Sequence, residues 1–248
     1  MFNRSIIKEL EAWKNKEDRK PLIMLGARQV GKTSVLKRFG KEQFVHCAYF
    51  SLDEEKGVCD IFRTTKNPVQ IIEQLSFLSE VPILPQETLL ILDEIQDCPE
   101  AISAMKYFCE KTPEYAVACA GSLLGLAFGH EGFSFPVGKV DHIKMYPVTF
   151  TEFLEQKDAG LYRYYQSIND IEPLPQIFFD RLSQAFTAYR ISGGMPEAAM
   201  AMIGKDMKGV ENILQNILQD YALDFVKHTS PLPVSYTHLR AHETDQYL

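Results

Sequence analysis

The chain has 248 residues, of which 46% are hydrophobic, and its formal net charge is −7. This length can bury one good core plus a small appendage, and the acidic charge gives no general basic footprint for nucleic acid. No stretch reaches the ~20 apolar residues of a membrane span, and the N-terminus lacks the apolar core of a signal peptide. Five cysteines without a C-x-x-C pair indicate free thiols, so we expect a cytoplasmic protein without a zinc site.

Residues 3–17 are predicted to form a helix, because Ile6, Leu10 and Trp13 recur on one face. Stacking of Trp13 on an adenine is conceivable, but packing against the core is the favoured interpretation. The apolar run at 21–25 then has the pattern of a buried parallel strand.

The nine residues after that run fit the phosphate-loop pattern G-x-x-x-x-G-K-[ST]. Its two glycines let the backbone turn tightly and approach an anion, while the loop N–H groups and the next helix's dipole attract phosphate. We expect Lys32 to reach the β- and γ-phosphates of a nucleotide and the Thr33 hydroxyl to ligate Mg2+. The predicted nucleotide-binding residues are Gly26, Ala27, Arg28, Gln29, Val30, Gly31, Lys32, Thr33 and Ser34.

A second strand is predicted at 48–52, and the acidic residues 53–55 after it are interpreted as a solvated turn rather than a second metal site. Asn67 and Pro68 have the cap and first-turn pattern of a helix start. A further helix is predicted over 101–110.

The run Leu-Leu-Ile-Leu at 89–92 has no polar alternation, which predicts a strand covered on both faces. Asp93 would lie at the carboxyl end of this strand, where open α/β sheets bind ligands. We expect Asp93 to hold Mg2+ and Glu94 to orient and polarise the attacking water. The alternative is a strand that ends in a solvated acidic turn.

Another strand is predicted over 116–120, and Ser122 follows it. We interpret Ser122 as a side chain that senses the γ-phosphate, with a plain turn as the alternative. The fifth strand is expected at 141–146, and Thr149 with Glu152 has the capping-box pattern of the next helix. Lys139 or Lys144 could reach a phosphate of a neighbouring protomer, although a solvated lysine is favoured.

Beyond residue 155 the strand pattern fades and helical spacing continues, with an amphipathic helix predicted over 209–227. Gly193 and Gly194 are a plausible hinge or tight helix junction. Arg190, just upstream, is one candidate to sense the γ-phosphate. We therefore divide the chain into an ATPase core at 1–154 and an incomplete helical appendage at 155–233.

Five motifs follow one another along the chain, and their order indicates a family: Gly26–Ser34, Leu89–Gln96, Ala120–Gly125, Met145–Leu154 and Gly193–Glu197. This order resembles the prokaryotic AAA-type ATP-binding proteins that carry a C-terminal domain of unknown function. The resemblance covers residues 1 to about 230. It implies an α/β P-loop NTPase core of three layers, α/β/α, around a parallel five-stranded sheet. An extra strand should lie between the phosphate-loop strand and the Asp-Glu strand, and a helical or winged-helix segment should follow the core.

The last residues have a different origin in our interpretation. Residues 234–244 read Val-Ser-Tyr-Thr-His-Leu-Arg-Ala-His-Glu-Thr. This run resembles the translation of a transposase-based sequencing adaptor. We expect 234–248 to be an artefact that replaces the true C-terminal domain, and we exclude these residues from fold and function. The i, i+4 pair His238 and His242 is excluded with them as a metal site.

The leading hypothesis is a Mg2+-dependent ATPase whose turnover moves the C-terminal segment. The alternative is a slow ATP-binding switch or scaffold that regulates a partner. A GTPase is disfavoured because Asn15-Lys16-Glu17-Asp18 precedes the phosphate loop, whereas the guanine-reading motif follows it. A P-loop kinase is also disfavoured, since adjacent Asp93 and Glu94 suit water activation. A homo-oligomer is possible, and DNA binding rests on family analogy alone.

Overall fold

The computed structural model describes residues 2–122 and 135–228, and its centre is a parallel sheet. The sheet order is β2-β3-β4-β1-β5. Strand β4 therefore lies between the phosphate-loop strand β1 and the Asp-Glu strand β3, as the family resemblance implies. The predicted five-stranded parallel α/β core is confirmed. The strands are β1 (Leu22–Leu25), β2 (His46–Ser51), β3 (Thr88–Asp93), β4 (Ala116–Gly121) and β5 (Asp141–Lys144).

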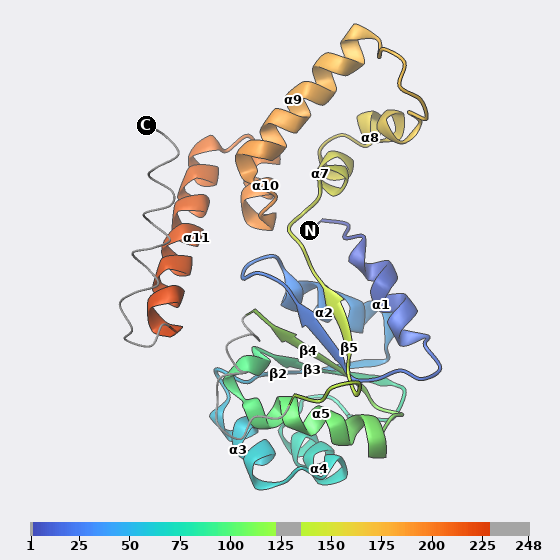
Figure 1. Ribbon diagram of the computed structural model, residues 1–248, viewed down its shortest axis with the longest axis vertical. Helices are drawn as coiled ribbons and strands as arrows, with labels where there is room; N and C mark the ends of the chain where they lie inside the picture. Colours follow the sequence, from blue (N-terminus) through green and yellow to red (C-terminus); the bar gives the residue numbers. More distant parts are fainter. Residues whose placement is uncertain (1, 123–134, 229–248) are drawn as a thin grey trace.

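Helices cover both faces of this sheet (Figure 1). On β3, Leu89 and Ile91 pack into one apolar cluster, whereas Leu90 and Leu92 pack into another. The first cluster includes side chains of α1 (Ile6–Lys14) and α2 (Lys32–Gln43). The second includes those of α3 (Lys56–Thr64), α4 (Pro68–Leu78) and α5 (Pro99–Lys111). Continuous apolar strands are thus explained by burial on both sides.

Trp13 belongs to the first of these clusters and is 5% exposed. Its indole Nε1 donates a hydrogen bond to the Lys20 carbonyl at 2.8 Å. The favoured interpretation of Trp13 as a core residue is confirmed.

A segment of helices follows β5: α7 (Phe150–Lys157), α8 (Ala159–Gln166), α9 (Gln176–Ser192), α10 (Pro196–Ile203) and α11 (Met207–His228). Within the described residues no strand follows β5, so the helical alternative to a winged helix is observed. In Figure 1 these helices lie beyond the end of β5, and α11 runs back beside the core.

The capping box predicted for α7 is present. The Thr149 hydroxyl accepts from the Glu152 amide at 3.2 Å, and the Glu152 carboxylate accepts from the Thr149 amide at 2.9 Å. The residues interpreted as adaptor, 234–248, lie outside the described part of the chain. None of the helices in the described part is long and apolar enough to cross a membrane.

Candidate nucleotide-binding site

The loop between β1 and α2 has the backbone that its glycines predict. Gly26 and Gly31 have φ values of 157° and 94°, and Gln29 has a φ of 61°. A Cβ on Gly26 would collide with the Met145 carbonyl oxygen, so a side chain there has no room. Gly31 is the N-cap of α2, which therefore begins at Lys32 and directs its N-terminus at the loop. The arrangement is that of an anion-binding loop.

Lys32 folds back over this loop. Its Nζ donates to the carbonyls of Gly26 at 2.9 Å and Ala27 at 2.8 Å, and the residue is 7% exposed. Burial lowers the pKa of Lys32, and the nearby carboxylates of Glu94 and Asp93 oppose that change. A buried ammonium held beside loop amides is a strong partner for an anion.

Asp93 joins the phosphate loop to the sheet. The Thr33 hydroxyl donates to Asp93 Oδ2 at 2.7 Å, and Asp93 is 5% exposed. Asp93 Oδ1 accepts from the Glu94 amide at 3.1 Å. The two residues predicted to hold Mg2+ therefore touch, although they are 60 positions apart in sequence.

Tyr49 is a member of this cluster that the sequence did not reveal. Its hydroxyl donates to Asp93 Oδ2 at 3.1 Å, the oxygen that also accepts from Thr33. Burial, together with the negative charge of Asp93, raises the pKa of Tyr49 to about 12. Tyr49 therefore stays a neutral donor that orients the Asp93 carboxylate. A strand tyrosine carries no motif, so only the sheet pairing could have identified it.

Glu94 follows in a left-handed backbone conformation, with φ 48° and ψ 48°. This conformation is uncommon for a residue other than glycine and occurs often at functional sites. Its carboxylate accepts from Gln96 Nε2 at 2.6 Å. The turn therefore places Glu94 at the mouth of the site with one oxygen held by Gln96.

Lys32, Thr33 and Glu94 line one cavity of about 620 Å³, a size typical of small-molecule sites. Asp53 belongs to its wall, so the acidic turn after β2 is part of the site rather than only a solvated turn. The helical segment contributes the start of α10. The lining residues are Arg28, Gln29, Gly31, Lys32, Thr33, Ser34, Asp53, Glu94, Gln96, Asp97, Pro196 and Glu197.

A second, mostly apolar cavity of about 320 Å³ adjoins the first, and the two share Gly31, Ser34, Pro196 and Glu197. Its other walls come from the N-terminus, the α2 side of the loop and α10. These residues are Phe2, Arg4, Val30, Val35 and Met200. One polar and one apolar hollow thus lie on the two sides of the same loop.

Two predicted residues do not join this arrangement. Ser122 directly follows β4, but it does not line either cavity, and its buried hydroxyl has no hydrogen-bond partner among the described residues. Its role therefore stays a prediction. Arg190 lies on the exposed side of α9 and does not line the cavities. Pro196 and Glu197, in the motif that follows Arg190, are the residues that reach the site.

Helix α11 also contacts the phosphate loop. Gln29 Nε2 donates to Asp220 Oδ2 at 2.9 Å, and the Tyr221 hydroxyl donates to the Arg28 carbonyl at 3.2 Å. The loop is therefore bordered by the sheet on one side and by α10 and α11 on the other.

The sheet order, the glycine loop and the Thr33–Asp93 contact define a P-loop nucleotide-binding protein. The family model described as "AAA domain" matches residues 18–154, which is more than half of the chain. The chain belongs to this AAA domain family.

Solved structures with a similar fold include three proteins of low sequence identity. C. elegans PCH-2 is 12% identical, with 86% of this chain and 70% of that chain covered and a TM-score of 0.43. The replication initiator DnaA, bound to AMPPCP and single-stranded DNA, is 15% identical, with 91% and 68% covered and a TM-score of 0.45. The Thermotoga maritima RuvB Holliday junction branch migration motor is also 15% identical, with 85% and 64% covered and a TM-score of 0.45. No curated protein matches the chain.

Proposed function

We propose that this protein binds ATP with Mg2+ at the phosphate loop and hydrolyses it. The observation that carries the proposal is the meeting of Lys32, Thr33 and Glu94 around one cavity, with the buried Asp93 in direct contact with Thr33 at 2.7 Å. A cation for phosphate, two hard oxygen ligands and a carboxylate at the mouth are the parts that phosphoryl transfer to water requires.

The donor set at Thr33 and Asp93 fits magnesium. A hydroxyl and a carboxylate are hard oxygen ligands, and Mg2+ commonly takes one or two such groups from the protein and the rest from water and phosphate. When bound there, the ion would neutralise charge that develops on the phosphate oxygens. Tyr49 keeps the Asp93 carboxylate in place through its hydrogen bond.

The protein groups have separate tasks in this proposal. The loop N–H groups and Lys32 hold the β- and γ-phosphates and bring them to Glu94. The Glu94 carboxylate orients a water molecule and accepts its proton as the water attacks. The apolar cavity at Phe2, Val30 and Met200 takes the base, which lets stacking and apolar contact hold a nucleotide from its other end.

The test uses the full 248-residue chain, with nucleotide binding and phosphate release measured with and without Mg2+. Glu94→Gln is expected to keep ATP binding and to lower turnover by about 10²- to 10⁴-fold. Glu87→Gln, an exposed glutamate just before the other end of β3, is the matched control and should behave as wild type. Undiminished hydrolysis by Glu94→Gln would remove the catalytic assignment. Competition of ATP against GTP tests the choice of base.

A slow ATP-binding switch is the second candidate, and one contact favours it. Gln96 Nε2 donates to a Glu94 carboxylate oxygen at 2.6 Å, which occupies one of that oxygen's acceptor positions and holds the carboxylate in one orientation. Under this alternative, Gln96→Ala turns over ATP faster than wild type. Under the ATPase proposal, the same change leaves turnover equal or lower, because Glu94 loses its orientation.

A further inference from the structure

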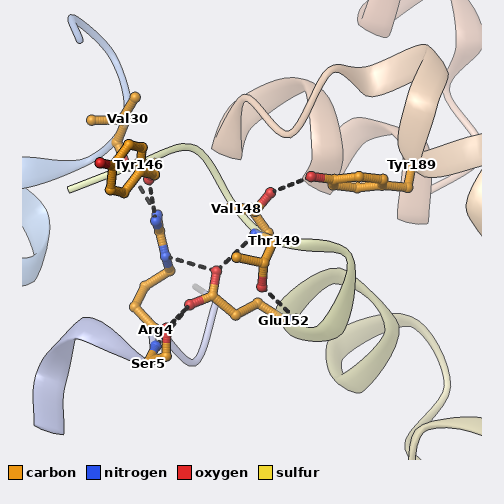
Figure 2. A network of polar contacts seen from close by, with 8 residues as sticks. All are labelled: Arg4, Ser5, Val30, Tyr146, Val148, Thr149, Glu152 and Tyr189. Carbon is orange, nitrogen blue, oxygen red and sulfur yellow. Dashed lines mark hydrogen bonds and ion pairs between the residues drawn. The ribbon is translucent and has the colours of Figure 1, made fainter. Parts of the chain in front are cut away.

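A buried arginine at the N-terminus joins three segments that lie far apart in sequence. Arg4 Nη1 donates to the Val30 carbonyl at 3.1 Å, and Nη2 donates to the Tyr146 carbonyl at 2.5 Å (Figure 2). Its Nε forms an ion pair with Glu152 Oε2 at 3.2 Å. Val30 belongs to the phosphate loop, Tyr146 to the connection from β5 to α7, and Glu152 to α7. One guanidinium thus contacts both the loop and the start of the helical segment.

Glu152 completes the connection on the other side. Its Oε1 accepts from the Ser5 amide at 2.7 Å and the Ser5 hydroxyl at 2.8 Å. Its Oε2 accepts from the Thr149 amide at 2.9 Å, which fixes the N-terminus of α7. The carboxylate is therefore both the partner of Arg4 and half of the α7 capping box (Figure 2).

The same connection is tied to the α9–α10 junction. The Tyr189 hydroxyl donates to the Val148 carbonyl at 2.9 Å, and the Val148 amide donates to the Gly194 carbonyl at 2.8 Å. Gly194 lies two residues before Pro196, which lines both cavities. A continuous set of contacts therefore runs from the Val30 carbonyl through Arg4 and residues 146–149 to the wall of the nucleotide site.

Stability alone does not explain this pair. Arg4 is 8% exposed and Glu152 6% exposed. Burial lowers the pKa of Arg4 even though the charge of Glu152 acts against that change. A buried ion pair of this kind often adds little net stability compared with apolar side chains, whereas its fixed geometry adds specificity. The planar guanidinium of arginine offers separate N–H groups to the two carbonyls and to Glu152 in one fixed fork, a geometry that the single ammonium of lysine does not reproduce.

We propose that Arg4, paired with Glu152, is a positioning residue that couples nucleotide occupancy of the phosphate loop to the placement of α7 and α10. The inference rests on the proposed nucleotide binding. When phosphates take the loop N–H groups, the Val30 peptide is held in one orientation and its carbonyl stays on Arg4. The guanidinium then holds the 146–149 connection, and through it the Gly194–Pro196 wall. Without phosphate, the loop and the connection are free to separate.

The experiment measures hydrogen exchange of the full chain with and without the non-hydrolysable nucleotide AMPPCP and Mg2+, together with AMPPCP affinity. In wild type, AMPPCP is expected to slow exchange in 26–34, 146–149 and 193–199. Arg4→Lys is expected to bind AMPPCP about 5- to 150-fold more weakly, the usual range of a coupling between sites. At saturating AMPPCP, this variant should show slowed hydrogen exchange in 26–34 but not in 193–199.

Three further variants make the readout specific. Arg63→Lys is the matched control, because Arg63 is an exposed arginine paired with Asp60 on α3 and should behave as wild type. Glu152→Gln should lose the same protection as Arg4→Lys, and the double variant should lose no more than either single one. Ser5→Ala removes only one hydrogen bond to Glu152 and should give a partial loss, which keeps the test open where the stronger variants fail to fold.

The outcomes separate the two proposals. Protection of 193–199 at saturating AMPPCP in Arg4→Lys and Glu152→Gln, equal to wild type, would overturn the coupling role. Wild-type protection confined to 26–34 would also overturn it and leave nucleotide binding intact. Absence of any AMPPCP effect in wild type would overturn the proposed function and this inference together.

Discussion

The sheet with its covering helices and the segment from α7 to α11 bury their apolar surface to different degrees. In the sheet, every residue of β3 and β4 is buried, and two large clusters fill both faces. In the helical segment the buried clusters are small. Several of its large apolar side chains are exposed, among them Phe179 at 53% and Leu218 at 69%.

This difference assigns different mechanical properties to the two regions. A region with a large buried core has few alternative arrangements of similar free energy. A region with small clusters opens at lower free energy, and moving elements are drawn from such regions. The phosphate loop and Asp93 belong to the first region, whereas Pro196 and Glu197 belong to the second. We therefore expect the nucleotide site to lie at the boundary between a more rigid wall, formed by the core, and a more movable wall, formed by the helical segment.

The largest expected effect comes from truncating Phe153, a fully buried side chain of α7, which tests whether the two regions unfold separately. Phe153→Ala is expected to cost about 3–5 kcal/mol of stability, through lost burial and a cavity. Hydrogen exchange should show loss of protection in α7–α11 while β1, β3 and β4 stay protected. Phe39→Ala in α2 is the control, and it should destabilise the sheet. Equal loss of protection in both regions after Phe153→Ala would show one cooperative unit.

The acid dependence of stability tests the boundary between the regions. Burial alone would raise the pKa of Glu152, but hydrogen bonds from Ser5 and Thr149 and the charge of Arg4 outweigh burial and lower it. A lowered folded-state pKa means that ionised Glu152 stabilises the fold above its ordinary pKa of 4.5 and loses this effect as pH falls below it. At pH 7, Glu152→Gln should be less stable than wild type by about 1.5–3 kcal/mol.

Urea unfolding of both proteins between pH 7 and pH 3 measures this difference. The gap between wild type and Glu152→Gln should narrow as the pH falls below 4.5. A gap that stays constant across the range would show that the charge of Glu152 does not act at the boundary.

The glycine pair before α10 tests how tightly the helical segment packs against one atom, the Val148 carbonyl oxygen. A Cβ on Gly194 would lie 2.6 Å from the Val148 carbonyl oxygen, whereas one on Gly193 would meet nothing within 4 Å. Both have positive φ, 63° for Gly193 and 71° for Gly194, so each alanine carries backbone strain of about 1–3 kcal/mol. Gly194→Ala should lower the Tm more than Gly193→Ala because it alone adds the collision. Equal Tm values for the two alanine variants would show that the 146–149 connection moves away from the added methyl group at little energetic cost.

The smallest expected effect is on the Mg2+ requirement of ATP binding, and it comes from Tyr49 in the sheet. Tyr49→Phe removes one hydrogen bond to Asp93, worth about 1 kcal/mol, or roughly fivefold in binding. The Mg2+ concentration needed for half-maximal ATP binding should rise by about that factor, with the Tm nearly unchanged. Tyr115→Phe, at the start of the β4 region, is the control. An unchanged Mg2+ requirement in Tyr49→Phe would remove Tyr49 from the site.

Local sequence patterns predicted correctly where the phosphate loop and Asp93 lie in the fold. The loop from Gly26 to Ser34 is contiguous, and the run before Asp93 is apolar throughout, so residue types and spacing were enough to bring both to the carboxyl edge of one sheet. Asp53 was interpreted as part of a solvated turn because its place depends on pairing. Ser51 is in register with Asp93, which puts the turn after β2 beside the site.

Contacts between distant segments could not be derived in this way. Arg4 meets a carbonyl 26 residues away and another 142 residues away, and no periodic pattern records either meeting. The same holds for Pro196 and Glu197, whereas Arg190 was singled out for its position just before Gly193 and by analogy with the lids of related ATPases. Backbone carbonyls carry no residue-type signal, so a contact that uses them is visible only once the chain is folded.

The hydrogen bond from the Tyr221 hydroxyl to the Arg28 carbonyl has a consequence for folding during synthesis. The two residues are 193 positions apart. At synthesis rates of about 5–20 residues per second, the phosphate loop exists for roughly 10–40 s before α11 can cover it. During synthesis, a nucleotide therefore meets a loop that is still open on the α11 side, and it can act as a folding template before α11 closes over the loop.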